Sequence, residues 1–252
     1  MGTSADGGTI LALEDVVSGY GKLTVLNGTS FTVARGAITT VIGPNGAGKS
    51  TVFKAVFGLL PVERGRVVFD GREATNVGPR KLLELGISYV PQGRNIFPEL
   101  SVRHNLELGA TAAGGGVGAR IELVMERFPV LRRKAVAQAS TLSGGEQKLL
   151  EIARSLLLDP KLMLIDEPSI GLSPRLVREI FDILGELRGK GVSILMVEQN
   201  ARRALEISDF GIVLEMGRTR MAGEARAILA DPRIGQLFLG GGLAPEAATV
   251  NA

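Results

Sequence analysis

A glycine-rich segment at residues 43–51 constrains the fold of this chain more than any other feature. It fits the phosphate-binding pattern G-x-x-x-x-G-K-S/T. An apolar, β-branched run precedes it at residues 37–42, and residues 50–58 have the pattern of a helix that ends on glycine. A buried parallel strand, a glycine loop and a helix are therefore expected in that order. The loop comprises Gly43, Pro44, Asn45, Gly46, Ala47, Gly48, Lys49, Ser50 and Thr51.

This arrangement suits the binding of a nucleoside triphosphate. Glycines allow the backbone to wrap closely around phosphates, while loop N–H groups and the helix N-terminus direct positive dipoles at the anion. Lys49 is expected to reach the outer phosphates, and the Ser50 hydroxyl is expected to bind Mg²⁺. The alternative is a plain glycine turn with an exposed lysine, but the flanking pattern favours the phosphate loop.

Composition excludes several other kinds of site. The 252 residues include no cysteine and one histidine, His104, which rules out disulfides, thiolate metal sites and histidine-based centres. The net charge is +3, aromatic residues make up 4% and tryptophan is absent, so no nucleic-acid partner is expected. No apolar run approaches the roughly 18 residues of a membrane helix, and residues 1–9 do not resemble a signal peptide.

The order of predicted elements indicates an α/β fold. Apolar strands alternate with helices except between about residues 94 and 150, where helices dominate. We therefore expect a mostly parallel core sheet with an antiparallel β part and a helical insertion, together forming one domain over residues 10–240. Residues 1–9 and 241–252 are expected to be flexible tails, and the glycine-rich residues 113–118 a flexible connection.

A second polar element follows the buried strand at residues 162–165. Asp166 is expected to hold Mg²⁺ through the water shell of the metal, and Glu167 to polarise an attacking water molecule. An acidic pair after a strand is more often a turn or a helix cap when it occurs alone. With the loop at 43–51 upstream, the catalytic interpretation is favoured.

The segment Leu142-Ser-Gly-Gly-Glu-Gln147 resembles the signature sequence, LSGGQ or LSGGEQ, of the ATP-binding-cassette (ABC) family. The alternative is a Ser-Gly-Gly linker before a helix. The resemblance implies that Ser143, Gly144 and Gly145 contact the γ-phosphate of ATP bound to an opposite subunit. The working unit would then be a sandwich dimer with two ATP molecules between the subunits.

Two further residues match positions of that family. The resemblance implies that Tyr20 stacks on adenine, although a surface tyrosine is the alternative. It also implies that Gln92 contacts Mg²⁺ and the attacking water and connects to a membrane partner. The following segment, residues 95–100, resembles the surface that receives a permease helix, with Ile96, Phe97 and Leu100 exposed there. Simple core packing of those three side chains is the alternative.

Two departures from the family pattern are present. Residues 169–174 read Ser-Ile-Gly-Leu-Ser-Pro, so the aspartate of the usual Ser-Ala-Leu-Asp is missing. Gln199 stands where the family usually has a histidine that contacts the γ-phosphate. Glutamine can donate a hydrogen bond but carries no charge. This puts the rate of hydrolysis in doubt and leaves ATP binding intact, and His104 in the helical insertion cannot substitute.

Four stretches resemble one subgroup of the family, the LivF-type ATP-binding subunits of branched-chain amino-acid importers: residues 93–97, 167–174, 197–201 and 237–241. That resemblance implies an ATPase at the cytoplasmic face of the membrane, with two permease subunits and a second ABC subunit, identical or different. An extracytoplasmic binding protein would act indirectly. Urea or short-amide import, a soluble ABC ATPase and a binding-only regulatory subunit remain alternatives. The soluble class usually carries two cassettes or long coiled coils, which this chain lacks.

Overall fold

The computed structural model describes residues 8–112 and 116–234 and contains two sheets. The larger sheet has the strand order β10-β9-β3-β8-β7-β6, and the smaller has the order β2-β1-β4-β5. In the larger sheet β6, β7, β8, β3 and β9 are parallel, and β10 is antiparallel to β9. The larger sheet comprises β3 (Ile38–Ile42), β6 (Ile87–Val90), β7 (Leu162–Asp166), β8 (Ser193–Val197), β9 (Phe210–Glu215) and β10 (Arg218–Glu224). The smaller, antiparallel sheet comprises β1 (Thr9–Tyr20), β2 (Leu23–Ala34), β4 (Val62–Phe69) and β5 (Arg72–Glu73).

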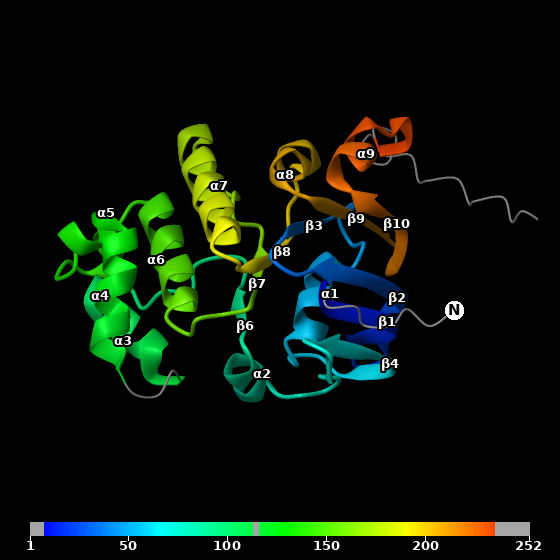
Figure 1. Ribbon diagram of the computed structural model, residues 1–252, viewed down its shortest axis with the longest axis horizontal. Coiled ribbons are helices and arrows are strands. Elements are labelled where there is room, and N and C mark those ends of the chain that lie inside the picture. Colours follow the sequence, from blue (N-terminus) through cyan, green and yellow to red (C-terminus); the bar gives the residue numbers. More distant parts are fainter. Residues whose placement is uncertain (1–7, 113–115, 235–252) are drawn as a thin grey trace, which may run out of the picture.

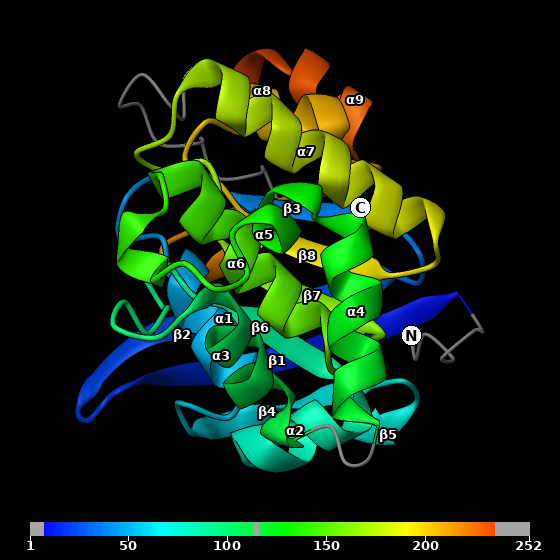
Figure 2. The same cartoon turned by 90° about the vertical axis from the view of Figure 1, so that its left-hand side faces the viewer.

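The helices divide into groups around these sheets. Figure 1 shows α3 to α6 together on one side and α1 beside the smaller sheet, and Figure 2 shows α4 to α6 in front of the larger sheet. Within the part of the chain that the structure describes, no helix is long and apolar enough to cross a bilayer. The helices are α1 (Lys49–Val56), α2 (Pro79–Leu85), α3 (Val102–Gly109), α4 (Val117–Arg127), α5 (Pro129–Arg133), α6 (Gly144–Leu156), α7 (Pro174–Gly189), α8 (Ala201–Ile207) and α9 (Ala225–Ala230).

The central strands β3, β7 and β8 of the larger sheet are buried along their whole length, and most of their residues are apolar. Along β7, Leu162 and Leu164 face a core that includes Phe53 of α1. Met163 and Ile165 face the opposite core, which lies beneath the helices. This alternation follows from the two-residue period of a strand. Each buried side chain of this kind contributes roughly 1.5–3 kcal/mol, so both layers are fixed relative to the sheet. The expected mixed α/β architecture is confirmed.

Three local expectations need correction or lie outside the described residues. Residues 117 and 118 begin α4 instead of continuing a loop, while residues 113–115 lie outside the described part. Thr9 belongs to β1, and the Gly8 carbonyl accepts a hydrogen bond from the Arg35 N–H at 2.7 Å. Thr9 is therefore part of the smaller sheet and not of a flexible tail, because β1 pairs with β2 from that residue onward. The remaining tail residues, 1–7 and 241–252, are not described.

Asp70 connects the two sheets at the end of β4. Its carboxylate accepts hydrogen bonds from Arg35 at 2.5 Å and from Lys161, which precedes β7, at 2.6 Å. The hydrogen bond from Lys161, followed by that from Arg35, lowers the pKa of Asp70 to about 2. A carboxyl group with a lowered pKa in the folded state stabilises the protein above its unfolded pKa, and this stabilisation is lost as the pH falls.

Asp70→Asn is therefore expected to reduce the free energy of unfolding by about 1 kcal/mol at neutral pH, because both cations are solvent-accessible. The difference from wild type should narrow as the pH falls below the unfolded value of 3.8 towards about 2. Urea denaturation at several pH values measures this. Glu206→Gln, which removes the exposed ion pair with Arg202 on α8, is the control. If the difference in unfolding free energy between wild type and Asp70→Asn grew as the pH fell, the stabilising role of the ionised Asp70 carboxylate would be contradicted.

Candidate functional site

The glycine loop joins β3 to α1 and lies against the end of β9. A Cβ atom at Gly43 would lie 2.1 Å from the Leu214 carbonyl oxygen, so no side chain fits there. Gly48 has a φ of 100° and a Cβ on it would lie 2.9 Å from Leu26 Cδ2. The loop backbone can follow this close path only because glycine occupies both positions.

Lys49 begins α1 and is largely enclosed by the loop. Its side chain is buried, and its ammonium donates hydrogen bonds to the carbonyl oxygens of Gly43 at 2.8 Å and Pro44 at 3.1 Å. Burial lowers the pKa of Lys49, while the charges of Glu167 and Asp166 oppose that shift. The cation therefore sits in the field of the carboxylates of Asp166, which ends β7, and Glu167, which follows it.

Asp166 ends β7 and is 2% exposed. The Ser50 hydroxyl donates a hydrogen bond to its Oδ1 at 3.3 Å, and the Tyr89 hydroxyl donates to its Oδ2 at 3.4 Å. Burial raises the pKa of Asp166, because the ionised form lacks its full hydration there. A buried carboxylate beside a hydroxyl presents the hard oxygen ligands that Mg²⁺ prefers. The structure thus brings together Ser50 and Asp166, two of the three residues expected at the metal, while the amide of the third, Gln92, contacts Glu167.

Glu167 adopts a left-handed backbone conformation with a φ of 49°. Such strain in a residue other than glycine is typical of functional sites. The Glu167 N–H donates to the Val197 carbonyl at 2.9 Å, which holds this position against β8. Gln92 donates to Glu167 Oε2 at 2.6 Å, and Gln199 donates to Oε1 and Oε2 at 3.0 and 2.9 Å. Two exposed amides therefore converge on one buried carboxylate.

Two residues next to this cluster carry interactions that the sequence analysis did not predict. The Tyr89 ring lies 6.0 Å from the Phe53 ring and 5.4 Å from the Phe57 ring, and burial raises the pKa of Tyr89. Glu198 accepts hydrogen bonds from the Ser169 N–H at 2.9 Å and hydroxyl at 2.8 Å. Burial also raises the pKa of Glu198. The sequence signal that could have identified Glu198 is its position as an acidic residue directly after the buried strand β8.

Tyr20 lies at the end of β1 with 43% of its surface exposed. Lys54, on α1, donates to the Tyr20 hydroxyl at 3.1 Å and lies 5.3 Å from the ring centroid. The tyrosine is therefore next to the helix that follows the phosphate loop. An exposed aromatic ring at this place is available to stack on a base.

The segment at residues 142–147 lies at the beginning of α6. The Ser143 side chain accepts from the Glu146 N–H at 3.4 Å, and Glu146 accepts from the Ser143 N–H at 2.9 Å, which makes a capping box. Lys134 also binds Glu146 at 2.7 Å. Ser143 and Gly144 are exposed, and Gly145 is buried. Figure 1 shows that α6 and α1 belong to different parts of the molecule. The helix that begins with the signature residues is thus separate from the helix that follows the phosphate loop.

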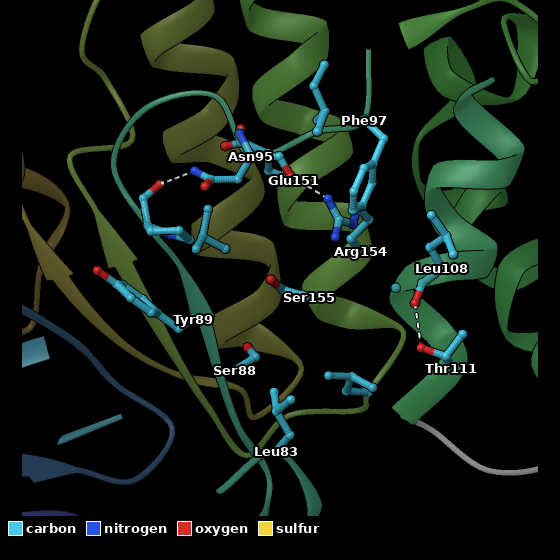
Figure 3. Close-up of a pocket in the computed structure, with 15 residues that line it drawn as sticks. Leu83, Ser88, Tyr89, Asn95, Phe97, Leu108, Thr111, Glu151, Arg154 and Ser155 are labelled. Atoms are coloured by element: carbon cyan, nitrogen blue, oxygen red, sulfur yellow. Dashed lines mark hydrogen bonds between the residues drawn. The ribbon is translucent and has the colours of Figure 1, made fainter. Parts of the chain in front are cut away.

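A groove of 590 Å³ opens between α6, β6 and the segment that follows Gln92 (Figure 3). Phe97 is 47% exposed, and the Arg154 guanidinium lies 5.3 Å from its ring centroid. Ile96 and Leu100 are half-buried, so the expected exposure holds for Phe97 and is wrong for these two. Ile96 is drawn inward because it packs against the core beneath the helices.

Comparisons with known proteins agree with this geometry. The profile of the family described as ABC transporter matches residues 26–170, which is more than half of the chain. The high-affinity branched-chain amino acid transport ATP-binding protein BraG of Pseudomonas aeruginosa is 38% identical over 92% of this chain and 100% of its own length. A probable branched-chain amino acid transport ATP-binding protein, LivF of Archaeoglobus fulgidus, is 40% identical over 88% of this chain and 95% of its own.

A relative with a different transport role and a solved structure also match. The lipopolysaccharide export system ATP-binding protein LptB of Haemophilus influenzae is 32% identical over 92% of this chain and 98% of its own. A crystal structure of an ABC transporter cassette in its ADP conformation has a TM-score of 0.84 and 32% identity, covering 92% of this chain and 99% of that one. The expected family resemblance is confirmed: the chain belongs to the ABC transporter family and is one of its nucleotide-binding ATPase subunits.

Proposed function

We propose that this chain is the ATP-hydrolysing subunit of an importer for branched-chain or related amino acids. The observation that carries the hydrolytic role is the convergence of Gln92 and Gln199 on the buried Glu167 carboxylate. Branched-chain amino acid transport, the role of the BraG and LivF relatives, supports this cargo.

The residues at the site fit MgATP. Ser50 and Asp166 together supply a hydroxyl and a carboxylate oxygen that would hold the metal. The buried Asp166 carboxylate has a raised pKa, so a cation placed beside it would relieve the cost of its charge. Lys49 and the loop N–H groups would bind the outer phosphates, and Tyr20 would support the base.

In the proposed mechanism the chain orients water and stabilises charge. Glu167 would accept a hydrogen bond from the attacking water and polarise it. Gln92 and Gln199 would fix that carboxylate by donating to it, and Gln199 would supply a neutral donor where related cassettes have an imidazole. Lys49 would hold the outer phosphates by charge-assisted hydrogen bonds. When bound, Mg²⁺ would neutralise part of the charge on the phosphate oxygens.

The position of the signature segment supports a shared site. Ser143 and Gly144 are exposed at the N-terminus of α6, where backbone N–H groups can bind an anion. We therefore propose that Ser143, Gly144 and Gly145 serve ATP bound to a second ABC subunit, which is either another copy or a different chain. This arrangement would place two ATP molecules between two subunits.

The groove beside Phe97 is the proposed contact with a permease subunit at the cytoplasmic face of the membrane. It is lined mainly by apolar side chains, and its lining includes Pro91 and Asn95, which lie on either side of Gln92 in sequence. An apolar segment of a membrane subunit seated there would bury the exposed Phe97 ring. Binding at the groove would then act directly on the segment that carries Gln92.

Phe97→Ala is expected to weaken retention of the chain by its cognate permease, because truncation of an aromatic anchor costs about 2 kcal/mol or more. Pull-down of the chain with detergent-extracted permease measures this. Leu123→Ala is the matched control, since Leu123 is 66% exposed on α4 and lies outside the groove. Equal retention of both variants would argue against this docking surface.

The cargo is tested by uptake of labelled leucine, isoleucine, valine and urea in cells that lack the gene. Loss of leucine uptake, restored by the wild-type gene and not by a Glu167→Gln gene, is the expected result. Intact leucine uptake with loss of urea uptake would overturn the amino-acid assignment. Failure of lipopolysaccharide export would instead favour the role of the LptB relatives.

A further inference from the structure

A buried ion pair on α6 holds the loop that follows Gln92. The Lys148 and Glu151 side chains are 7% and 4% exposed, and Lys148 Nζ lies 2.5 Å from Glu151 Oε2. The other carboxylate oxygen of Glu151 accepts a hydrogen bond from the Asn95 N–H at 2.6 Å. Lys148 also donates to the Gly93 carbonyl at 3.4 Å. Both members of the pair therefore bind loop backbone.

The same face of α6 makes a further contact with this loop, one turn along the helix. Residues at positions i, i+3 and i+6 project to one side, so Arg154 lies beyond Glu151 (Figure 3). Arg154 donates to the Asn95 carbonyl. The Asn95 side chain closes the loop by donating to the Pro91 and Gln92 carbonyls, each at 3.3 Å. The backbone from Pro91 to Asn95 is thus tied to α6.

The ion pair is not needed for folding energy alone. Removing two charges from water costs several kcal/mol per ion, and well-packed apolar residues commonly replace such pairs without loss of stability. What an apolar pair could not supply is the acceptor for the Asn95 N–H and the donor for the Gly93 carbonyl. The directional contacts with the loop therefore give the pair a role beyond packing.

We propose that Lys148 and Glu151 are positioning residues for ATP hydrolysis, which fix the 93–95 backbone so that Gln92 stays in contact with Glu167. This inference rests on the proposed role of Gln92 at the Glu167 carboxylate. The chain of contacts runs from α6 through Asn95 to Gln92, whose amide lies 2.6 Å from Glu167. Glu151 and Arg154 also line the proposed permease groove. The contacts of α6 with the 91–95 segment therefore join that groove to the Glu167 carboxylate.

The test combines a double variant with a second change at Gln92. Lys148→Met with Glu151→Leu removes both charges together, which avoids an unpaired buried ion. Turnover at saturating ATP is expected to fall roughly tenfold in the full chain, because small misplacements of a catalytic group are costly. The dissociation constant for ATP should stay within about twofold, since the phosphate loop is not touched.

The decisive measurement is whether the losses of turnover caused by the double variant and by Gln92→Ala add when the changes are combined. In a Gln92→Ala background the double variant should cause no further loss of turnover, because a residue that acts through Gln92 has nothing left to position. A further tenfold loss, or wild-type turnover of the double variant alone, would overturn the inference while leaving the proposed role of Gln92 intact. Wild-type turnover of Gln92→Ala alone would instead remove the proposed role of Gln92, and the inference with it.

Two further variants keep the test interpretable. Glu151→Asp preserves both charges but shortens the reach to the Asn95 N–H, so it should fold and also lower turnover. Unchanged turnover of Glu151→Asp and of the double variant would count against positioning. Arg103→Gln with Glu122→Gln is the control, because it removes an ion pair of 2.6 Å between α3 and α4 that does not involve the loop.

Discussion

Replacing Glu167 by glutamine is expected to lower ATP turnover by roughly 10²- to 10⁴-fold, the range found for loss of a positioned general base. The amide keeps the shape of the side chain and can still contact Gln92 or Gln199, so the local fold should persist. Lys49, Ser50 and Asp166 are unchanged, and ATP affinity should stay within about twofold of wild type. Phosphate release and equilibrium titration with MgATP measure the two quantities.

Glu198→Gln is the matched control for Glu167. Glu198 is also buried after a core strand, but its carboxylate accepts from Ser169 and from the Gln199 backbone N–H, whereas the side-chain amides of Gln92 and Gln199 donate to Glu167. This variant should retain most of the turnover. If Glu167→Gln hydrolysed ATP at the wild-type rate, the role proposed for that carboxylate would be lost.

Lys49→Ala is expected to weaken ATP binding itself. The ammonium is the fixed charge proposed to hold the outer phosphates, and loss of a hydrogen bond to a charged group costs about 1.5–3 kcal/mol, or roughly 10- to 150-fold in affinity. Hydrolysis should fall with it, because the same charge stabilises the transferring phosphoryl group. Calorimetric titration of the variant with MgATP measures the loss.

Lys81→Ala serves as the control for Lys49. Lys81 is an exposed lysine of α2 that pairs with Glu84 at 3.1 Å. Its removal should leave ATP affinity unchanged. Wild-type affinity and turnover in Lys49→Ala would remove the proposed role of the phosphate loop.

Much of the fold follows from the sequence because the signals are local. The continuous apolar runs at β3, β7 and β8 predict strands buried on both faces, and alternation with helices predicts a parallel sheet. The short helices α8 and α9 were not predicted, since six or seven residues carry too little periodicity. The helix α6 begins at Gly144 although Gly144 and Gly145 disfavour a helix, because the capping box of Ser143 and Glu146 outweighs them.

The candidate site was predictable in its motifs and not in its contacts. Lys49, Asp166 and Glu167 belong to patterns with a fixed spacing, which identify them without a structure. The contact of Tyr89 with Asp166 and that of Glu151 with the Asn95 backbone join residues 77 and 56 positions apart. Such pairings depend on which strands and helices become neighbours. The contacts of Lys148 and Glu151 with the loop after Gln92 can therefore be found only from the structure.

The nucleotide retained by Glu167→Gln tests the central claim most directly. The variant is incubated with Mg²⁺ and radiolabelled ATP, separated from free nucleotide, and its bound nucleotide is identified. If Glu167 polarises the attacking water while the phosphate loop binds, the variant will retain ATP, and wild type treated alike will hold ADP. Recovery of ADP from Glu167→Gln in the same proportion as from wild type would contradict this account of the site.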